Sequence, residues 1–179
     1  MKTLFHPDIS SNFISIGTKL KIHYLEGKPK RNKKECPTAL LLHGFPELSF
    51  SWRKIMPKLV AEGFRVIAPD QRGYGKTVGG SKDFEDDIRQ YSLFNLTIDI
   101  LSFLFKLKIY KVDLLVGHDA GSIVAGTAAL IRPDIFKSVV MMSAPYTGVP
   151  KINVKKNSDP IHKNLKDLPV PRKHYQWYY

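Results

Sequence analysis

The stretch Val116-Gly-His-Asp-Ala-Gly121 decides the fold, because it joins two segments of different character. Residues 111–116 form a short apolar run of the kind found in buried strands, and residues 121–131 form a helical segment of small residues. A Gly-x-nucleophile-x-Gly pattern between a strand and a helix marks a nucleophile elbow, where only small residues fit two positions before and after the nucleophile. The stretch therefore predicts a strained backbone at Asp119, whose carboxylate stands exposed above a sheet.

An aspartate at the nucleophile position points to a particular chemistry. The Asp119 carboxylate is already ionised at neutral pH, so no base is needed to activate it. It can attack carbon directly and form an alkyl ester, which suits epoxides and alkyl halides rather than esters. The N–H of Ala120 and the N-terminus of the following helix would favour an anion there. The alternative is that Asp119 only caps the helix.

A second motif, His43-Gly-Phe-Pro46, follows the apolar run at residues 39–42. In this position the backbone N–H of Phe45 would point into the same space as that of Ala120. Together the two N–H groups would form an oxyanion hole. We expect the side chain of His43 to brace the turn, because the backbone donors do the chemistry.

A third motif, Asp70-Gln-Arg-Gly-Tyr-Gly75, follows the apolar run at residues 65–69. Its glycines allow a tight turn beside the site. We expect Asp70 and Arg72 to hold loops together rather than to contact substrate. Three motifs in this order, each after a strand, favour a catalytic Asp119 over a helix cap.

Strand-like and helix-like segments alternate along the chain, which is typical of an α/β fold with a mostly parallel sheet and helices on both faces. The alternation of apolar and polar residues around Gly17 predicts a β-hairpin at 13–16 and 19–25. The other expected elements are strands at 39–43, 65–70, 111–116 and 138–143, and helices at 51–61, 93–107 and 121–131. After Pro145 the chain becomes basic, aromatic and proline-rich, so we expect a core at 1–146 and a linker into a second substructure at 147–179.

The composition of the chain limits its function class. The chain has 179 residues, a net charge of +12 and a single cysteine, Cys36. It holds no apolar run of about 18 residues, so no membrane span is expected. The basic clusters at 28–34 and 151–173 contain prolines, and we interpret them as solvated surface rather than as a nucleic-acid site. With no secretory signal and no internal disulfide, we expect a cytoplasmic protein without cofactor or metal, whose oligomeric state stays open.

The motifs together resemble the epoxide hydrolase branch of the α/β-hydrolase superfamily. The segments that carry the resemblance lie at 43–47, 51–53, 69–75, 117–121 and 142–145, and residues 173–179 look like the opening of the family's helical cap. The resemblance covers roughly residues 10 to 179. It implies an α/β-hydrolase fold, a linker and the start of the cap at 147–179, and a small, apolar epoxide as substrate.

The resemblance also implies roles for individual residues. Asp119 would attack an epoxide carbon and form an alkyl-enzyme ester, while a tyrosine from the cap donates a hydrogen bond to the epoxide oxygen. Tyr178 is the best match for that tyrosine because of its Trp-Tyr context, with Tyr175 and Tyr179 as rivals and cap packing as the alternative for all three. A histidine, oriented by an acidic residue, then activates the water that hydrolyses the ester.

Dehalogenases share the same elbow and are the first alternative. Haloalkane dehalogenases commonly carry asparagine where Phe45 stands and tryptophan where Ala120 stands. Haloacetate dehalogenases carry arginines at positions matching Ala120 and Ile123. This sequence has none of these halide-binding or carboxylate-binding side chains, which favours an epoxide as substrate.

The residues that hydrolyse the ester are the missing part of the resemblance. The family's base histidine and its acid follow the cap, whereas the latest histidines here, His162 and His174, precede or open it. We therefore expect a truncated chain that lacks the last strands of the sheet, most of the cap and catalytic turnover. A non-catalytic pseudoenzyme fragment is the second alternative.

Overall fold

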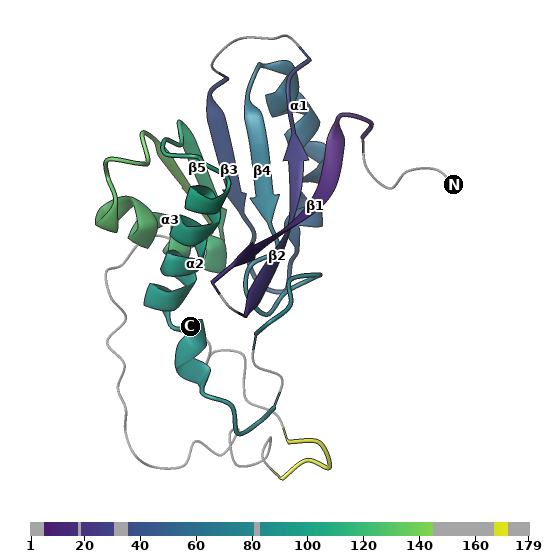
Figure 1. Ribbon diagram of the computed structural model, residues 1–179, viewed down its shortest axis with the longest axis vertical. Coiled ribbons are helices and arrows are strands. Elements are labelled where there is room, and N and C mark those ends of the chain that lie inside the picture. The colour runs from purple at the N-terminus through teal and green to yellow at the C-terminus, as the bar shows by residue number, and fades with distance from the viewer. Residues whose placement is uncertain (1–5, 18, 31–35, 81–82, 145–166, 172–179) are drawn as a thin grey trace.

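A computed structural model describes residues 6–17, 19–30, 36–80, 83–144 and 167–171 (Figure 1). Over these residues the chain forms a six-stranded sheet in the order β1-β2-β4-β3-β5-β6. The pairs β1–β2 and β2–β4 are antiparallel, and the pairs β4–β3, β3–β5 and β5–β6 are parallel. The strands are β1 (Ile9–Ile16), β2 (Leu20–Gly27), β3 (Thr38–Leu42), β4 (Arg65–Pro69), β5 (Leu114–His118) and β6 (Val139–Met142). This arrangement confirms the predicted hairpin and the mostly parallel sheet.

Helices cover both faces of the sheet, with α2 and α3 on one side of the strands and α1 on the other (Figure 1). Side chains alternate between the two faces of a strand, so successive residues of β3 pack against helices on opposite sides of the sheet. Leu40 belongs to a buried cluster with Phe103 of α2, and Leu41 belongs to a second cluster with Met56 of α1. The helices are α1 (Met56–Ala61), α2 (Leu93–Lys106) and α3 (Ala120–Ile131), with short 3₁₀ helices η1 (Ser49–Lys54) and η2 (Ile88–Tyr91).

Several predicted elements have different bounds in the structure, and β1 begins at Ile9, four residues before the expected start. The helix expected at 51–61 is divided into η1 and α1, which begins at Met56 and carries Pro57 in its first turn. Proline has no backbone N–H to continue a helix from the preceding turn, so the chain ends one helix and starts another. The strand expected at 111–116 begins at Leu114, and before it Val112 makes only an isolated bridge to Phe136.

The three sequence motifs meet at one edge of the sheet. Parallel strands end on the same side, and ligands of open α/β sheets bind outside these carboxyl ends. β3, β4 and β5 end at Leu42, Pro69 and His118, directly before or within the three motifs. The fold therefore brings together segments that lie up to 74 residues apart, as the contact between Phe45 and Asp119 shows.

Residues 147–166 and 172–179, which include the predicted opening of the cap, lie outside the described residues. The predicted division of the chain at residue 146 therefore stays a prediction. Within the part of the chain that the structure describes, none of the helices has the length and apolar character that crossing a membrane requires.

Candidate active site

Asp119 sits at a strained turn between β5 and α3. Its backbone has φ 51° and ψ −122°, a conformation that non-glycine residues rarely adopt. Hydrogen bonds hold this backbone on both sides: the Asp119 N–H donates to the carbonyl of Met142, and the Ser122 N–H donates to the carbonyl of Asp119, both at 2.9 Å. The strain predicted at this position is therefore present, and the flanking elements hold it in place.

Glycines make room for the turn. A Cβ at Gly117 would collide with the carbonyl of Gly121, and a Cβ at Gly121 would collide with the carbonyl of Leu42 in the neighbouring strand. A Cβ at Gly44 would lie 2.5 Å from the Cβ of Asp119. The prediction that only small residues fit around the nucleophile position is confirmed, and Gly44 extends it to the facing loop.

Two backbone amides contact the Asp119 carboxylate. The Phe45 N–H donates to Asp119 Oδ1 at 2.9 Å, and the Ala120 N–H also forms a hydrogen bond with the carboxylate. Burial raises the pKa of Asp119, but the hydrogen bonds from Phe45 and Ala120 and the charge of His118 lower it more. The pKa therefore lies below its ordinary value, and the side chain is ionised at neutral pH. The two amides expected to form an oxyanion hole thus converge on one carboxylate.

An acid–histidine pair, which the sequence motifs did not predict, lies directly beside Asp119. His118 Nδ1 is 2.8 Å from Glu47 Oε2, and the Gly44 N–H donates to the same oxygen at 3.2 Å. Burial raises the pKa of Glu47, but the hydrogen bonds from His118 and Gly44 lower it by a larger amount. The pKa of Glu47 therefore lies below its ordinary value. Glu47 and His118 are 71 residues apart in the sequence. The only sequence signal for their contact is that Glu47 directly follows the His43–Pro46 motif and His118 lies within the elbow motif.

The His43 side chain braces the turn, as expected. It is fully buried, its Nδ1 lies 2.9 Å from the carbonyl oxygen of Gly44, and its Nε2 accepts a hydrogen bond from the Gln71 N–H at 3.0 Å. Because Nε2 accepts, Nδ1 carries the proton and donates to Gly44. Burial lowers the pKa of His43, which keeps the ring neutral. His43 therefore connects the second and third motifs.

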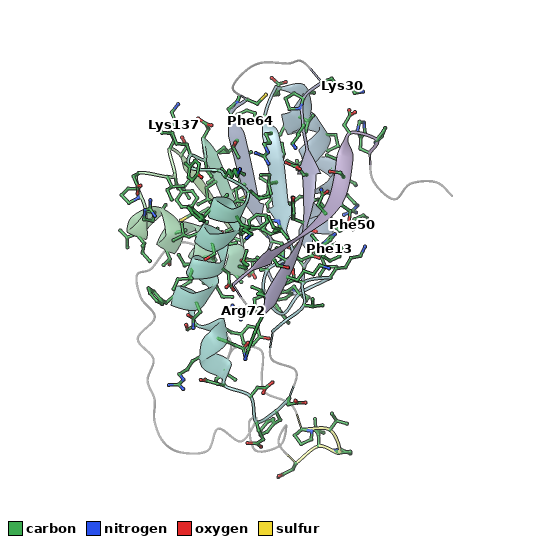
Figure 2. All side chains as sticks on the ribbon, viewed as in Figure 1. Phe13, Lys30, Phe50, Phe64, Arg72 and Lys137 are labelled. Carbon is green, nitrogen blue, oxygen red and sulfur yellow. The ribbon has the colours of Figure 1, made fainter. Side chains whose placement is uncertain are left out.

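Asp70 and Arg72 also hold loops together, as predicted. Arg72 binds Asp99 of α2 through two hydrogen bonds of 2.7 and 2.6 Å, and Figure 2 shows Arg72 at the end of the sheet near this helix. Asp70 is buried and accepts backbone N–H donors from Ser49 at 2.8 Å and from Lys76 at 3.0 Å. These contacts fix the loops after β3 and β4.

The cap tyrosine Tyr178, its rivals Tyr175 and Tyr179, and the late histidines His162 and His174 lie outside the described residues. The roles of these residues stay predictions. Among the residues that the structure does describe, no group of three or more histidine, cysteine or acidic side chains is placed to hold a metal ion.

Known proteins share this fold and these motifs. A family model described as the alpha/beta hydrolase fold matches residues 37–179. An epoxide hydrolase from Caballeronia sordidicola is 42% identical over 110 residues, which are 62% of this chain and 32% of that protein. Among solved structures, the epoxide hydrolase VrEH1 from Vigna radiata is 36% identical with a TM-score of 0.66, covering 78% of this chain and 41% of its own. A laboratory-evolved variant of the potato epoxide hydrolase StEH1 is 33% identical with a TM-score of 0.70, covering 88% of this chain and 45% of its own.

The chain thus spans about a third of the length of the Caballeronia relative and under half of each of these two structures. The match with the family model extends over most of the chain, including all three motifs of the site. The chain therefore belongs to the alpha/beta hydrolase fold family, and the region it contains is epoxide hydrolase-like.

Proposed function

We propose that the chain carries the nucleophile of an epoxide hydrolase and that Asp119 opens an epoxide through an alkyl-enzyme ester. The observation that carries this proposal is an ionised carboxylate at a strained elbow, held by the amides of Phe45 and Ala120. The names of the similar proteins support an epoxide as substrate class. A small, apolar epoxide remains our prediction for the substrate, as does a cytoplasmic location for the protein.

The first step of the proposed reaction is a displacement at carbon. A carboxylate oxygen of Asp119 forms a bond to an epoxide carbon, and the carbon–oxygen bond of the ring breaks with its electron pair moving to the ring oxygen. That oxygen takes up a proton, which we propose comes from the hydroxyl of Tyr178. The carboxylate loses its charge in this step and becomes an ester.

The second step is hydrolysis of that ester. Water attacks Cγ of Asp119, and the ester carbonyl oxygen takes on negative charge. Because the Phe45 amide already lies 2.9 Å from Oδ1, it is placed to stabilise the charge on this oxygen, with the amide of Ala120 beside it. We propose that a base histidine activates the water, and that without such a base the reaction of these 179 residues stops at the ester.

An alkyl halide is the second candidate substrate, since it would react at the same carboxylate. The resemblance implies that haloalkane dehalogenases hold the departing halide with side-chain N–H donors, and the side chains of Phe45 and Ala120 carry none. This observation favours an epoxide over a halide. A pseudoenzyme would keep the fold and leave Asp119 unreactive.

Intact-protein mass spectrometry distinguishes these possibilities. The chain is incubated with a reactive aryl epoxide, and we expect one adduct per chain. Asp119→Asn should lose the adduct, while the matched control Asp134→Asn, at an exposed aspartate outside the site, should keep it. An adduct that survives Asp119→Asn would refute the nucleophile, and no adduct in any variant would favour the pseudoenzyme.

A further inference from the structure

A second group of reactive side chains lies outside the Asp119 site, on the β1–β2 hairpin. Ser11 Oγ of β1 lies 2.8 Å from His23 Nε2 of β2, and His23 Nδ1 lies 2.7 Å from Asp70 Oδ2. A serine, a histidine and an aspartate joined through both ring nitrogens form the arrangement that activates serine nucleophiles on unrelated folds. We propose that Ser11 is a second nucleophile of this protein, which His23 and Asp70 activate toward aryl esters and phosphonyl fluorides.

Asp70 sets the tautomer of the His23 ring. Burial raises the pKa of Asp70, but hydrogen bonds from Ser49, Lys76 and His23 lower it by a larger amount. The pKa therefore lies below its ordinary value, and the carboxylate is ionised at neutral pH. An ionised carboxylate can only accept hydrogen bonds, so a neutral His23 carries its proton on Nδ1. The lone pair of Nε2 then faces the Ser11 hydroxyl, which is the tautomer that a general base needs.

The group is buried at its base and open at its nucleophile. The side chains of His23 and Asp70 are only 4% and 3% exposed, whereas Ser11 is an exposed residue of β1. Burial protects the His23–Asp70 hydrogen bond from competing water and strengthens it. The Ser11 hydroxyl thus lies where a substrate can reach it, with a fixed base behind it.

The surroundings of Ser11 favour an aromatic substrate. The ring of Phe13 lies 5.0 Å from the ring of His23 and is 48% exposed on the hairpin, where Figure 2 labels it. The ammonium group of Lys21 lies 5.1 Å from the centre of the Phe13 ring. An exposed ring can stack with an aryl group, and a nearby cation favours the negative charge that develops on an attacked carbonyl or phosphonyl oxygen.

The proposed step balances without any further reactant. The Ser11 oxygen forms a bond to the acyl carbon or to phosphorus, and its proton moves to His23 Nε2. The Asp70 carboxylate stabilises the resulting imidazolium ion. The leaving group, a phenolate from an aryl ester or fluoride from a phosphonyl fluoride, departs with the bonding electron pair. This acyl or phosphonyl transfer differs from carboxylate attack on an epoxide, so the proposal stands independently of the role of Asp119.

A fluorophosphonate tests the proposal, with Ser15 as the internal control. Ser15 is also exposed and lies on the same face of β1 four residues later, opposite Lys21. A positioned general base contributes about 10²–10⁴-fold, so we expect peptide mass spectrometry to show Ser11 labelled about 100-fold faster than Ser15. Ser11→Ala should lose the label and keep the epoxide adduct on Asp119, whereas Ser15→Ala should keep both. Equal labelling of the two serines, or no label on Ser11, would overturn the proposal.

A thiol in place of the hydroxyl gives a second measurement that does not depend on the phosphonyl group. In a Cys36→Ser background, S11C and S15C are treated with iodoacetamide at neutral pH. A thiol beside a histidine base is present to a larger extent as thiolate, so S11C should be alkylated faster than S15C by about tenfold or more. Adding His23→Gln to S11C should remove this difference. If S11C reacts at the same rate with His23 as with His23→Gln, His23 does not activate position 11.

Discussion

Replacing Gly44 by alanine tests how closely the loop after β3 must approach Asp119. The new Cβ would lie 2.5 Å from the Asp119 Cβ, 2.8 Å from the His118 carbonyl oxygen and 2.9 Å from Asp119 Oδ1. All three neighbours belong to the elbow, whose backbone is fixed by hydrogen bonds on both sides. The loop at 43–46 therefore has to move away from the elbow.

The size of this movement follows from the contact distances. Ordinary van der Waals contact begins at 3.4 Å, so the loop must open by about 0.9 Å from the present 2.5 Å. The Phe45 N···Oδ1 distance then grows from 2.9 Å to about 3.8 Å, beyond the range of a hydrogen bond. We expect the forced packing to cost about 1–3 kcal/mol of stability. A misplacement of this size should slow alkylation of Asp119 by about 100-fold.

The assay is the rate of adduct formation on Asp119, measured by mass spectrometry over a range of pH. Losing the Phe45 hydrogen bond removes a contact that lowers the pKa of Asp119, so the fall in rate at acid pH should begin at a higher pH in Gly44→Ala. Gly17→Ala is the control, since it adds the same methyl group at a positive φ of 57° with nothing within 4 Å. The control should lose some stability and keep the alkylation rate. Alkylation of Gly44→Ala at the wild-type rate would refute the reasoning.

Two further predictions concern the loops that frame the site. Arg72→Ala leaves the carboxylate of Asp99 buried without its bidentate partner, and breaking such a pair should lower the free energy of unfolding in urea by about 3 kcal/mol. Arg89→Ala, which removes the exposed pair with Asp87, should leave the urea midpoint nearly unchanged. Equal losses of unfolding free energy in the two variants would contradict a larger stabilising role for the Arg72–Asp99 pair. Burial lowers the pKa of His43 in the folded chain, so its contribution to stability is present above the ordinary pKa of 6.5 and is lost as the pH falls below it. The urea midpoint should therefore decrease from about pH 7 to about pH 5, and it should decrease less in His43→Asn; the same decrease in both proteins would show that other groups cause it.

Local sequence patterns predicted the parts of the fold that depend on neighbouring residues. The glycines at 117 and 121 require a tight turn whatever the rest of the chain does, and the structure shows that a Cβ fits at neither position. The hairpin around Gly17 was also predicted from neighbouring residues, because the side chains of a strand alternate between two faces and the sequence alternates between apolar and polar residues. The predicted helix at 51–61 contains Pro57, and the structure shows that the helix divides there. Pro57 lies in the first turn of α1, where a missing backbone N–H is tolerated.

Contacts between distant segments were beyond the reach of sequence patterns. Glu47 meets His118 only because β3 and β5, which are separated in the sequence, become neighbours in the sheet, whereas Ser11 meets His23 across the predicted hairpin. The residues around a histidine in a strand do not indicate which distant side chains it contacts. The order of β2 and β4 in the sheet brings His23 to Asp70, although 47 residues separate them.

Reaction of the protein with an epoxide in ¹⁸O-labelled water tests the central claim most directly. If Asp119 attacks the epoxide, the peptide that contains Asp119 must change in mass in one of two ways. It carries the alkyl group if the ester persists, and it gains ¹⁸O in its carboxylate if water hydrolyses the ester at Cγ. Our account predicts one of these two marks on Asp119 and on no other residue. Formation of a diol while Asp119 carries neither the alkyl group nor ¹⁸O would contradict it.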